Sequence, residues 1–410
     1  MKYSQNSKDF WRVTAAVSAA SLVTFFNLYL VQPLLPIFAR DYQISPLTAN
    51  SVLSAAMLGM ALGLLLLASL SDAIGRRKIL LSSIILVPCI SLLIGLVPAP
   101  SFHYIVVLRF FQGLFLAGVP AVAIAYLAEQ LDANALIKSV GIFIAANSLG
   151  GIGGRLLGGW GAELLGSWSM AFVLVALLSL SMGIVVCFLL PMEAPTAASP
   201  WRLRQSLVNY KQHLGNSQLV AAYLVGGVGF GVFINQFSYL TFILADAPYS
   251  LPSSLSSLLF LSYLGGTFTA SSAGRIADKI GGKRCIMAGL SLMALASLLS
   301  LFGQLWLLLL AMVVSSMGFF FCHAQASAWV NQHATQAKAS ASALYTISYY
   351  LGAACGGVLL QPFFSVWGWS GIVFASVSAL TGVLWVAGRF LKGGELSAQQ
   401  LLLDPSGTRR

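Results

Sequence analysis

Two arginines stand inside long apolar stretches of the sequence, where a charge is costly. Arg109 lies within residues 103–127 and Arg155 within residues 138–164. A charged side chain at the centre of a membrane-spanning helix costs about 2.5–3.5 kcal/mol, so such residues usually face a cavity or a partner. The eleven acidic residues lie at the ends of apolar stretches or between them. The two arginines therefore have no carboxylate partner at their own depth.

A buried guanidinium without a carboxylate suits an anionic ligand, because its planar fork of N–H donors matches the two oxygens of a carboxylate or phosphate. The alternative is that backbone carbonyls and polar neighbours satisfy each arginine, which then serves as a structural strut. Beside Arg155, residues Gly150, Gly154 and Gly158 form a stripe of small side chains on the same helix. Such a stripe predicts that another helix approaches closely.

His323 is the only histidine in the interior of an apolar stretch, residues 305–330. An imidazole with an unperturbed pKa of about 6.5 can gain and lose a proton near neutral pH. His323 is therefore a candidate proton carrier. The alternative is a packing residue held by a hydrogen bond.

The elements that must position these residues are membrane-spanning helices. The chain of 410 residues is 58% hydrophobic and 8% charged, with a mean hydropathy of +0.86. A soluble protein carries about 25% charged residues, and one bilayer crossing takes about 20 apolar residues. We predict twelve spans: 13–38, 48–70, 79–98, 103–127, 138–164, 168–190, 219–244, 253–274, 285–303, 305–330, 339–366 and 369–390. The first is too long for a signal peptide and is expected to be retained.

The basic residues indicate the orientation of these spans. Of the 22 lysines and arginines, all except Arg40, Arg109 and Arg155 lie in the tails or loops that share a side with both termini. Cytoplasmic loops are enriched in basic residues, so both termini are predicted to be cytoplasmic. The net charge of +11 occurs in short clusters between spans, which argues against nucleic-acid binding. The five cysteines lie in apolar stretches at spacings that match no metal site.

The sequence divides into two similar halves. The segment Asp72–Arg77 after the second span is repeated as Asp278–Lys283 after the eighth, with the same spacing of aspartate and glycine. Leu149–Gly154 in the fifth span is matched by Leu351–Gly356 in the eleventh. Parallel six-helix halves related by an axis along the membrane normal occur in transporters. We therefore predict an N-terminal bundle at 1–190, a cytoplasmic linker at 191–216 and a C-terminal bundle with a short tail at 217–410.

Four motifs make the chain resemble the major facilitator superfamily, and within it the proton-coupled drug-exporter-like branch. They are Pro33-Leu34-Leu35-Pro36, the loop Asp72–Arg77, Arg109-Phe110-Phe111-Gln112-Gly113, and Gly154-Arg155-Leu156-Leu157-Gly158-Gly159, in which Arg155 replaces the proline of the exporter motif. The resemblance implies an all-α membrane protein with twelve transmembrane helices in two pseudo-symmetric six-helix bundles. It also implies a cytoplasmic gate, for which the candidates are Asp72, Gly75, Arg76, Glu129, Asp278, Gly281 and Lys283.

The resemblance further implies a central cavity built largely from the first, fourth, seventh and tenth spans. The substrate or cavity candidates are Asn27, Gln32, Arg109, Gln112, Asn147, Arg155, Asn235, Gln236, Tyr239, His323, Tyr345 and Tyr349. The alternative for each polar residue is ordinary hydrogen bonding between helices.

The predicted function is secondary active transport by alternating access, with proton-coupled export of a small organic compound. The alternative is an organic anion porter, importing or exchanging, that recognises a carboxylate or phosphate through Arg155 and Arg109. We expect a monomer in the cytoplasmic (inner) membrane, with protons as coupling ion. The sequence has no nucleophile–base pair, Walker motif or metal-site spacing, so we expect no enzymatic activity, cofactor or metal.

Overall fold

The computed structural model describes residues 2–5, 7–191 and 203–391, and these residues form an almost entirely helical molecule. In the N-terminal bundle the elements are α1 (Lys8–Tyr29), η1 (Gln32–Leu34), α2 (Leu35–Asp41), α3 (Pro46–Ile74), α4 (Arg76–Leu96), α5 (Phe102–Leu116), α6 (Gly118–Gln130), α7 (Ala133–Leu164) and α8 (Trp168–Leu189). The linker carries α9 (Leu203–Leu214). The C-terminal bundle holds α10 (Ser217–Ala245), α11 (Ser253–Ser257), η2 (Leu258–Ser262), α12 (Tyr263–Ile280), α13 (Gly282–Leu299), η3 (Ser300–Phe302), α14 (Leu305–His333) and α15 (Lys338–Phe390).

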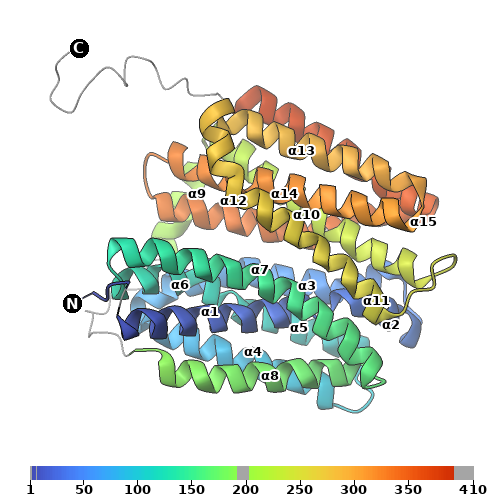
Figure 1. Ribbon diagram of the computed structural model, residues 1–410, viewed down its shortest axis with the longest axis horizontal. Coiled ribbons are helices and arrows are strands. Elements are labelled where there is room, and N and C mark those ends of the chain that lie inside the picture. The colour runs from blue at the N-terminus through green and yellow to red at the C-terminus, as the bar shows by residue number, and fades with distance from the viewer. Residues whose placement is uncertain (1, 6, 192–202, 392–410) are drawn as a thin grey trace.

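The two bundles lie side by side, with their long helices roughly parallel (Figure 1). Both ends of the described chain lie at one end of the molecule, which we call the proximal end. The turn regions around α2 and α11 lie at the opposite, distal end. Large apolar side chains stay exposed on the outer surface, among them Leu164 at 80% and Phe188 at 77%. A surface of this kind is stable in lipid and would aggregate in water.

The long helices correspond to the predicted spans, with two differences in how they are divided. Ten helices of the described chain are long and apolar enough to cross a membrane. The last of them, Lys338–Phe390, covers both predicted spans 339–366 and 369–390 and bends at Gly368, which has φ 56° and ψ −135°. The eighth predicted span is α11, η2 and α12, and the last of these carries Arg275, Asp278 and Lys279, which make it too polar to be counted among the ten.

The linker is also more structured than predicted. Residues 191–216 were expected to form a polar connection, yet Leu203–Leu214 form the helix α9. This helix contacts α10 and α15 of the C-terminal bundle and α3 of the N-terminal bundle. Its apolar residues recur at helical spacing, which gives it one face that can pack on the bundles. The remainder of the linker, and the tail after Leu391, lie outside the described residues.

Glycine-lined contacts hold corresponding helices together in the two halves. A Cβ atom on Gly154 or Gly158 of α7 would meet backbone atoms of α1. In the second half a Cβ on Gly352 or Gly356 of α15 would meet the backbone of α10. The predicted close approach along the glycine stripe is therefore confirmed, with α1 as the partner. Since the same packing recurs between α10 and α15, the sequence repeat is also a structural repeat.

Candidate functional site

Arg155 lies at the interface between the two bundles and is completely buried. Its Nε donates to Gln32 Oε1 at 2.7 Å, its Nη1 to the carbonyl of Gly151 at 2.8 Å, and its Nη2 to the hydroxyl of Tyr263 at 3.2 Å. These acceptors are neutral. None of the ion pairs in the described part of the chain includes Arg155. The described residues therefore give this buried guanidinium no carboxylate partner.

Three aromatic rings enclose this guanidinium. Its central carbon lies 3.8 Å from the ring centroid of Tyr29, 4.5 Å from that of Tyr263 and 4.7 Å from that of Phe260. The negative faces of such rings attract a cation by about 0.5–2 kcal/mol each. Tyr29 comes from the N-terminal bundle, whereas Phe260 and Tyr263 come from the C-terminal one. Aromatic rings from both bundles therefore contact the same guanidinium.

The end of α1 places Gln32 and Tyr29 against Arg155. This helix ends at Tyr29, and Gln32 begins a 3₁₀ turn that contains Pro33. Proline has no N–H to continue an α-helix, so the chain tightens and turns there. The amide of Gln32 then bridges the bundles, because its Nε2 donates at 3.0 Å to both the Ile234 carbonyl and the Ser238 hydroxyl of α10.

A second buried bridge joins α3 to α10. The Asn50 Nδ2 donates to Asn235 Oδ1 at 2.9 Å. Asn235 in turn donates to the carbonyls of Gly231 at 2.9 Å and Ala353 at 3.0 Å. A side chain on Gly357 would collide with both amides, so the glycine there leaves the bridge its space. Asn235 therefore belongs to the interface, whereas Asn50 was not among the predicted residues.

The distal end of the interface is joined by further hydrogen bonds. Glu163 accepts from the backbone N–H of Ser254 at 3.1 Å, and Trp160 donates to the Ser254 carbonyl at 3.0 Å. The Ser253 hydroxyl donates to the carbonyl of Gly159 at 3.0 Å. Together with the contacts that Arg155, Gln32 and Asn50 make to the C-terminal bundle, these bonds form what we call the distal seam. The seam holds the end of α7 against the start of α11.

Arg109, in contrast, lies within the N-terminal bundle. It is completely buried, and its donors reach the carbonyls of Asn27 at 2.8 Å, Leu28 at 2.8 Å and Val52 at 3.2 Å. The carbonyls of Asn27 and Leu28 belong to the last turn of α1, which has no following helical N–H to bind them. A cation is also favoured at the negative end of a helix dipole. These contacts favour the structural alternative for Arg109.

Asn27 and Gln112 belong to the same network around Arg109. Arg109 Nη1 also donates to Gln112 Oε1, and the Gln112 amide donates to the Ser91 hydroxyl at 2.6 Å. Ser91 donates to Asn27 Oδ1 at 2.7 Å, and Asn27 donates to Ser179 at 2.8 Å. These predicted cavity residues therefore meet as a buried polar core that ties α1, α4, α5 and α8 together.

Three other cavity candidates, Asn147, Gln236 and Tyr239, lie apart from the hydrogen-bond networks of Arg155 and Arg109. Asn147 is partly exposed and accepts from Ser21 of α1. Gln236 points between α10 and α13, where it donates to Ser297 at 2.7 Å. Tyr239 donates to the Gly357 carbonyl at 2.8 Å within the C-terminal bundle. These contacts are ordinary interhelical hydrogen bonds.

His323 lies in an aromatic cluster of the C-terminal bundle. Its Nδ1 is 2.9 Å from the hydroxyl of Tyr345, and its ring packs on Phe319 and Tyr349 with centroid distances of 5.6 and 5.0 Å. Tyr349 stacks on Phe230 of α10 at 3.6 Å. Three of the predicted residues, on α14 and α15, are thus brought into contact.

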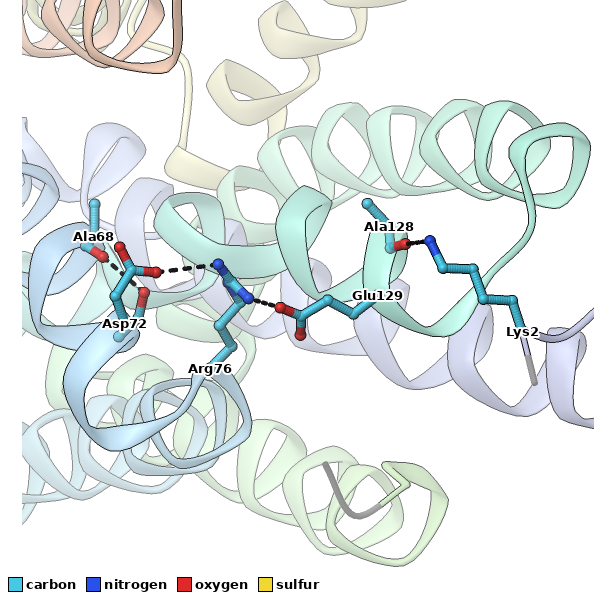
Figure 2. Close-up of polar contacts among 7 residues, drawn as sticks. Lys2, Ala68, Asp72, Arg76, Ala128 and Glu129 are labelled. Carbon is cyan, nitrogen blue, oxygen red and sulfur yellow. Dashed lines mark hydrogen bonds and ion pairs between the residues drawn. The ribbon is translucent and has the colours of Figure 1, made fainter. Parts of the chain in front are cut away.

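Three of the residues predicted for a gate, Asp72, Arg76 and Glu129, meet in the N-terminal bundle (Figure 2). Arg76 lies between Asp72, at 3.1 Å, and Glu129, with which it also forms an ion pair. Gly75 separates α3 from α4 with φ 101°, a conformation that favours glycine. All these residues belong to one bundle, and in this structure Asp72 pairs with Arg76 of the same bundle.

The repeat of this motif has the same backbone but different side-chain contacts. Gly281 has φ 89° between α12 and α13. Lys283 donates to the carbonyl of Gly388 at 2.7 Å. Asp278 is exposed, and no hydrogen bond or ion pair of the described residues includes its side chain. The triad of Asp72, Arg76 and Glu129 therefore has no counterpart among the described residues of the second half.

Two helical bundles joined through a buried polar interface define a polytopic membrane transport protein. The family model of the Major Facilitator Superfamily matches residues 17–257 and 248–400. The chain belongs to this superfamily. The homologous proteins of this superfamily are transporters rather than enzymes.

Relatives that are 32% identical align over nearly the whole chain. An uncharacterized MFS-type transporter of Bacillus subtilis, YybF, is 32% identical over 382 residues, which are 92% of this chain and 93% of that protein. The inner membrane transport protein YnfM of Escherichia coli is 32% identical over 368 residues, 90% of this chain and 88% of that protein.

Solved structures of low sequence identity share the fold. A mutant of the nucleoside transporter NupG aligns with a TM-score of 0.74 and 14% identity, covering 93% of this chain and all of that chain. A bacterial homolog of the human lysosomal transporter Spinster, in an inward-facing and unoccupied conformation, aligns with a TM-score of 0.64 and 14% identity, covering 94% of this chain and 95% of that chain.

Proposed function

We propose that this protein is a secondary active transporter that moves a small organic anion by alternating access, with Arg155 as the group that recognises the anion. The observation that carries this proposal is the completely buried guanidinium at the bundle interface with neutral partners only. A buried cation is costly unless an anion or several dipoles compensate it. A substrate carboxylate would supply the missing negative charge.

The position of Arg155 supports its coupling to transport. Its guanidinium donates hydrogen bonds to Gln32 of the N-terminal bundle and to Tyr263 of the C-terminal bundle. An anion that binds the guanidinium competes for these donors and so weakens the distal seam. We propose that the structure is the state closed at the distal end, and that opening of the seam produces the alternative state.

The proposal is tested in everted membrane vesicles with labelled mono- and dicarboxylates, with and without a proton gradient. Saturable uptake of a carboxylate is expected for the parent protein and is lost in Arg155→Met, while Arg155→Lys keeps part of it. Arg389→Met, which removes an exposed arginine at the proximal end, is the matched control and keeps full uptake. Equal loss of a neutral and an anionic substrate in Arg155→Met would remove the basis for anion recognition.

A second candidate is proton-coupled export of an uncharged compound, as the exporter-like motifs indicate. The observation that favours it is the contact between His323 and Tyr345, a titratable pair inside the C-terminal bundle. Vesicle uptake of a neutral compound that depends on a proton gradient and survives Arg155→Lys would select this candidate.

We further propose a monomer in the inner membrane with cytoplasmic termini and bundles at 1–190 and 217–410. An inner-membrane relative supports the location. Single cysteines introduced at exposed Lys138 and Lys279 should then be labelled from the cytoplasmic side only. Labelling of either from the outside would reverse the orientation.

A further inference from the structure

The Tyr345 hydroxyl has two acceptors on the same residue of α14. It lies 2.9 Å from His323 Nδ1 and 3.3 Å from the backbone carbonyl of His323. Tyr345 is almost fully buried, and a Cβ atom on Gly226 of α10 would collide with its ring. The hydroxyl is therefore fixed within reach of both acceptors.

This arrangement accommodates the imidazole with or without a second proton. When Nδ1 is unprotonated, the Tyr345 hydroxyl donates to it. When Nδ1 gains a proton, Nδ1–H donates to the Tyr345 oxygen and the hydroxyl proton turns to the His323 carbonyl. A buried donor or acceptor that loses its partner costs about 1–3 kcal/mol, and here neither protonation state leaves one unpaired on this side of the ring.

We propose that His323 is the residue that binds and releases the coupling proton, with Tyr345 as the positioning residue that changes its acceptor. The proton arrives from water on one side of the membrane and leaves to water on the other. Tyr345 stays neutral throughout, since it gives up no proton in the exchange. His323 is partly exposed, whereas Arg155 is completely buried.

Two other histidines face backbone carbonyls instead. His213 Nε2 faces the carbonyl of Ala337, and His333 Nδ1 faces the carbonyl of Trp329. A carbonyl can only accept, so the ring nitrogen is the donor in each of these hydrogen bonds. His323 instead faces a hydroxyl, which can both donate and accept.

No acidic side chain of the described residues contacts the His323 ring. The titratable side chains in ring contact with His323 are Tyr345 and Tyr349 of α15. Tyr350 of α15, Tyr263 of α12 and Cys322 of α14 belong to the same cluster, to which α10 contributes Phe230 and Phe233. The charged residues of these helices lie toward helix ends: Arg275, Asp278 and Lys279 of α12, Lys283 and Arg284 of α13, and Lys338 and Arg389 of α15. A proton on His323 therefore adds an uncompensated positive charge to the cluster.

The cluster also reaches the bundle interface. The His323 ring packs on Phe319, Phe319 stacks on Phe233, and Phe233 packs on Tyr263, whose hydroxyl accepts from Arg155. A proton on His323 thus brings a second positive charge toward Arg155 from the other bundle. If the proposed anion transport holds, on which this step alone rests, the proton and the anion favour each other's binding.

The test needs no substrate. Spin labels are attached through an unnatural amino acid at positions Ala133 and Lys279, both exposed and on different bundles, in the full-length chain in lipid nanodiscs. The distance distribution is measured by pulsed electron resonance between pH 5.5 and 8.5. We expect the ratio of the two states to change at least fivefold across this range in the parent chain.

The variants decide between a proton site and a packing residue. His323→Asn keeps an acceptor near Tyr345 but takes up no proton, and it should abolish the pH response; His323→Gln serves if the first variant does not fold. Tyr345→Phe should reduce the response, and His333→Asn should leave it unchanged. Nitrogen NMR of ¹⁵N-histidine protein should show His323 becoming imidazolium in the same range.

A pH response retained in His323→Asn, no response in the parent chain, or an imidazole that stays neutral throughout would each overturn the proposal. Because none of these measurements involves a carboxylate, a failure here is distinct from a failure of anion transport in the vesicle assay.

Discussion

Replacement of Arg109 by methionine tests whether this buried charge is a structural element of the N-terminal bundle. The guanidinium donates to the carbonyls of Asn27 and Leu28 at the end of α1, to the carbonyl of Val52 in α3, and to Gln112. Methionine fills similar space and donates nothing. The substitution therefore leaves the carbonyls at the end of α1 unpaired in a dry interior, where water cannot replace the lost donors.

The size of the effect follows from these carbonyls. The Val52 carbonyl lies inside α3 and keeps its helical hydrogen bond, so the loss falls on Asn27 and Leu28. Each unpaired buried acceptor costs about 1–3 kcal/mol. Removal of the buried charge also removes the free-energy cost of its desolvation. We therefore take the lower limit of this range, about 1 kcal/mol for each of the two carbonyls. We expect a destabilisation of about 2 kcal/mol, or about 4–8 °C in melting temperature for a unit of this size.

Thermal unfolding in detergent, followed by tryptophan fluorescence and size-exclusion chromatography, measures this shift. Arg389→Met, at the exposed end of α15, provides the control and should melt like the parent protein. An Arg109→Met protein that melts unchanged but no longer transports would contradict the structural role. Arg109 would then have to contact the substrate or the proton path.

Three further predictions concern packing, the turn and the ion pairs. Gly154→Leu should prevent α7 from approaching α1 and abolish folded protein on size exclusion, whereas Gly141→Leu, at a position with open space around it, should be tolerated. Gly75→Ala forces a side chain into a backbone with φ 101° and should lower unfolding stability by about 1–2 kcal/mol in denaturant titration. Glu129→Gln should change stability by less than about 1 kcal/mol, because the pair with Arg76 is exposed; a double-mutant cycle with Arg76→Gln that gave several kcal/mol would contradict this.

The sequence was sufficient for features that depend on spacing along one helix. The stripe Gly150, Gly154 and Gly158 predicted a close helix neighbour, and α1 fills that place. The gate candidates Asp72 and Arg76, four residues apart, form an ion pair with each other. The repeat at residues 278–283 correctly predicted a second glycine turn, since Gly281 has the same backbone conformation as Gly75.

Features that depend on tertiary contact could not be read in this way. Arg109 and Arg155 look alike in sequence, yet one binds the end of α1 and the other lies between the bundles. The difference depends on where α1 ends. Pro33 and Pro36 indicate a turn after this helix, but they do not indicate which side chain contacts the turn. Tyr29, Phe260 and Tyr263 were missed because aromatic residues are common in membrane helices. Asn50 was the one omission with a usable signal, a polar amide near the end of an apolar span.

The distal seam also explains why one bundle interface can serve two states. Its contacts are mostly hydrogen bonds between neutral groups, such as Asn50 with Asn235 and Gln32 with Ser238. Such bonds in membrane proteins average about 0.6 kcal/mol each, so a seam of this size stabilises one state by about 4 kcal/mol. A ligand that binds only the open state shifts the equilibrium by RT ln(1 + c/Kd), where c is the free ligand concentration; this reaches about 4.1 kcal/mol at about 1,000 times Kd and then offsets the seam. In the proposed mechanism the anion supplies this free energy as it takes the donors of Arg155.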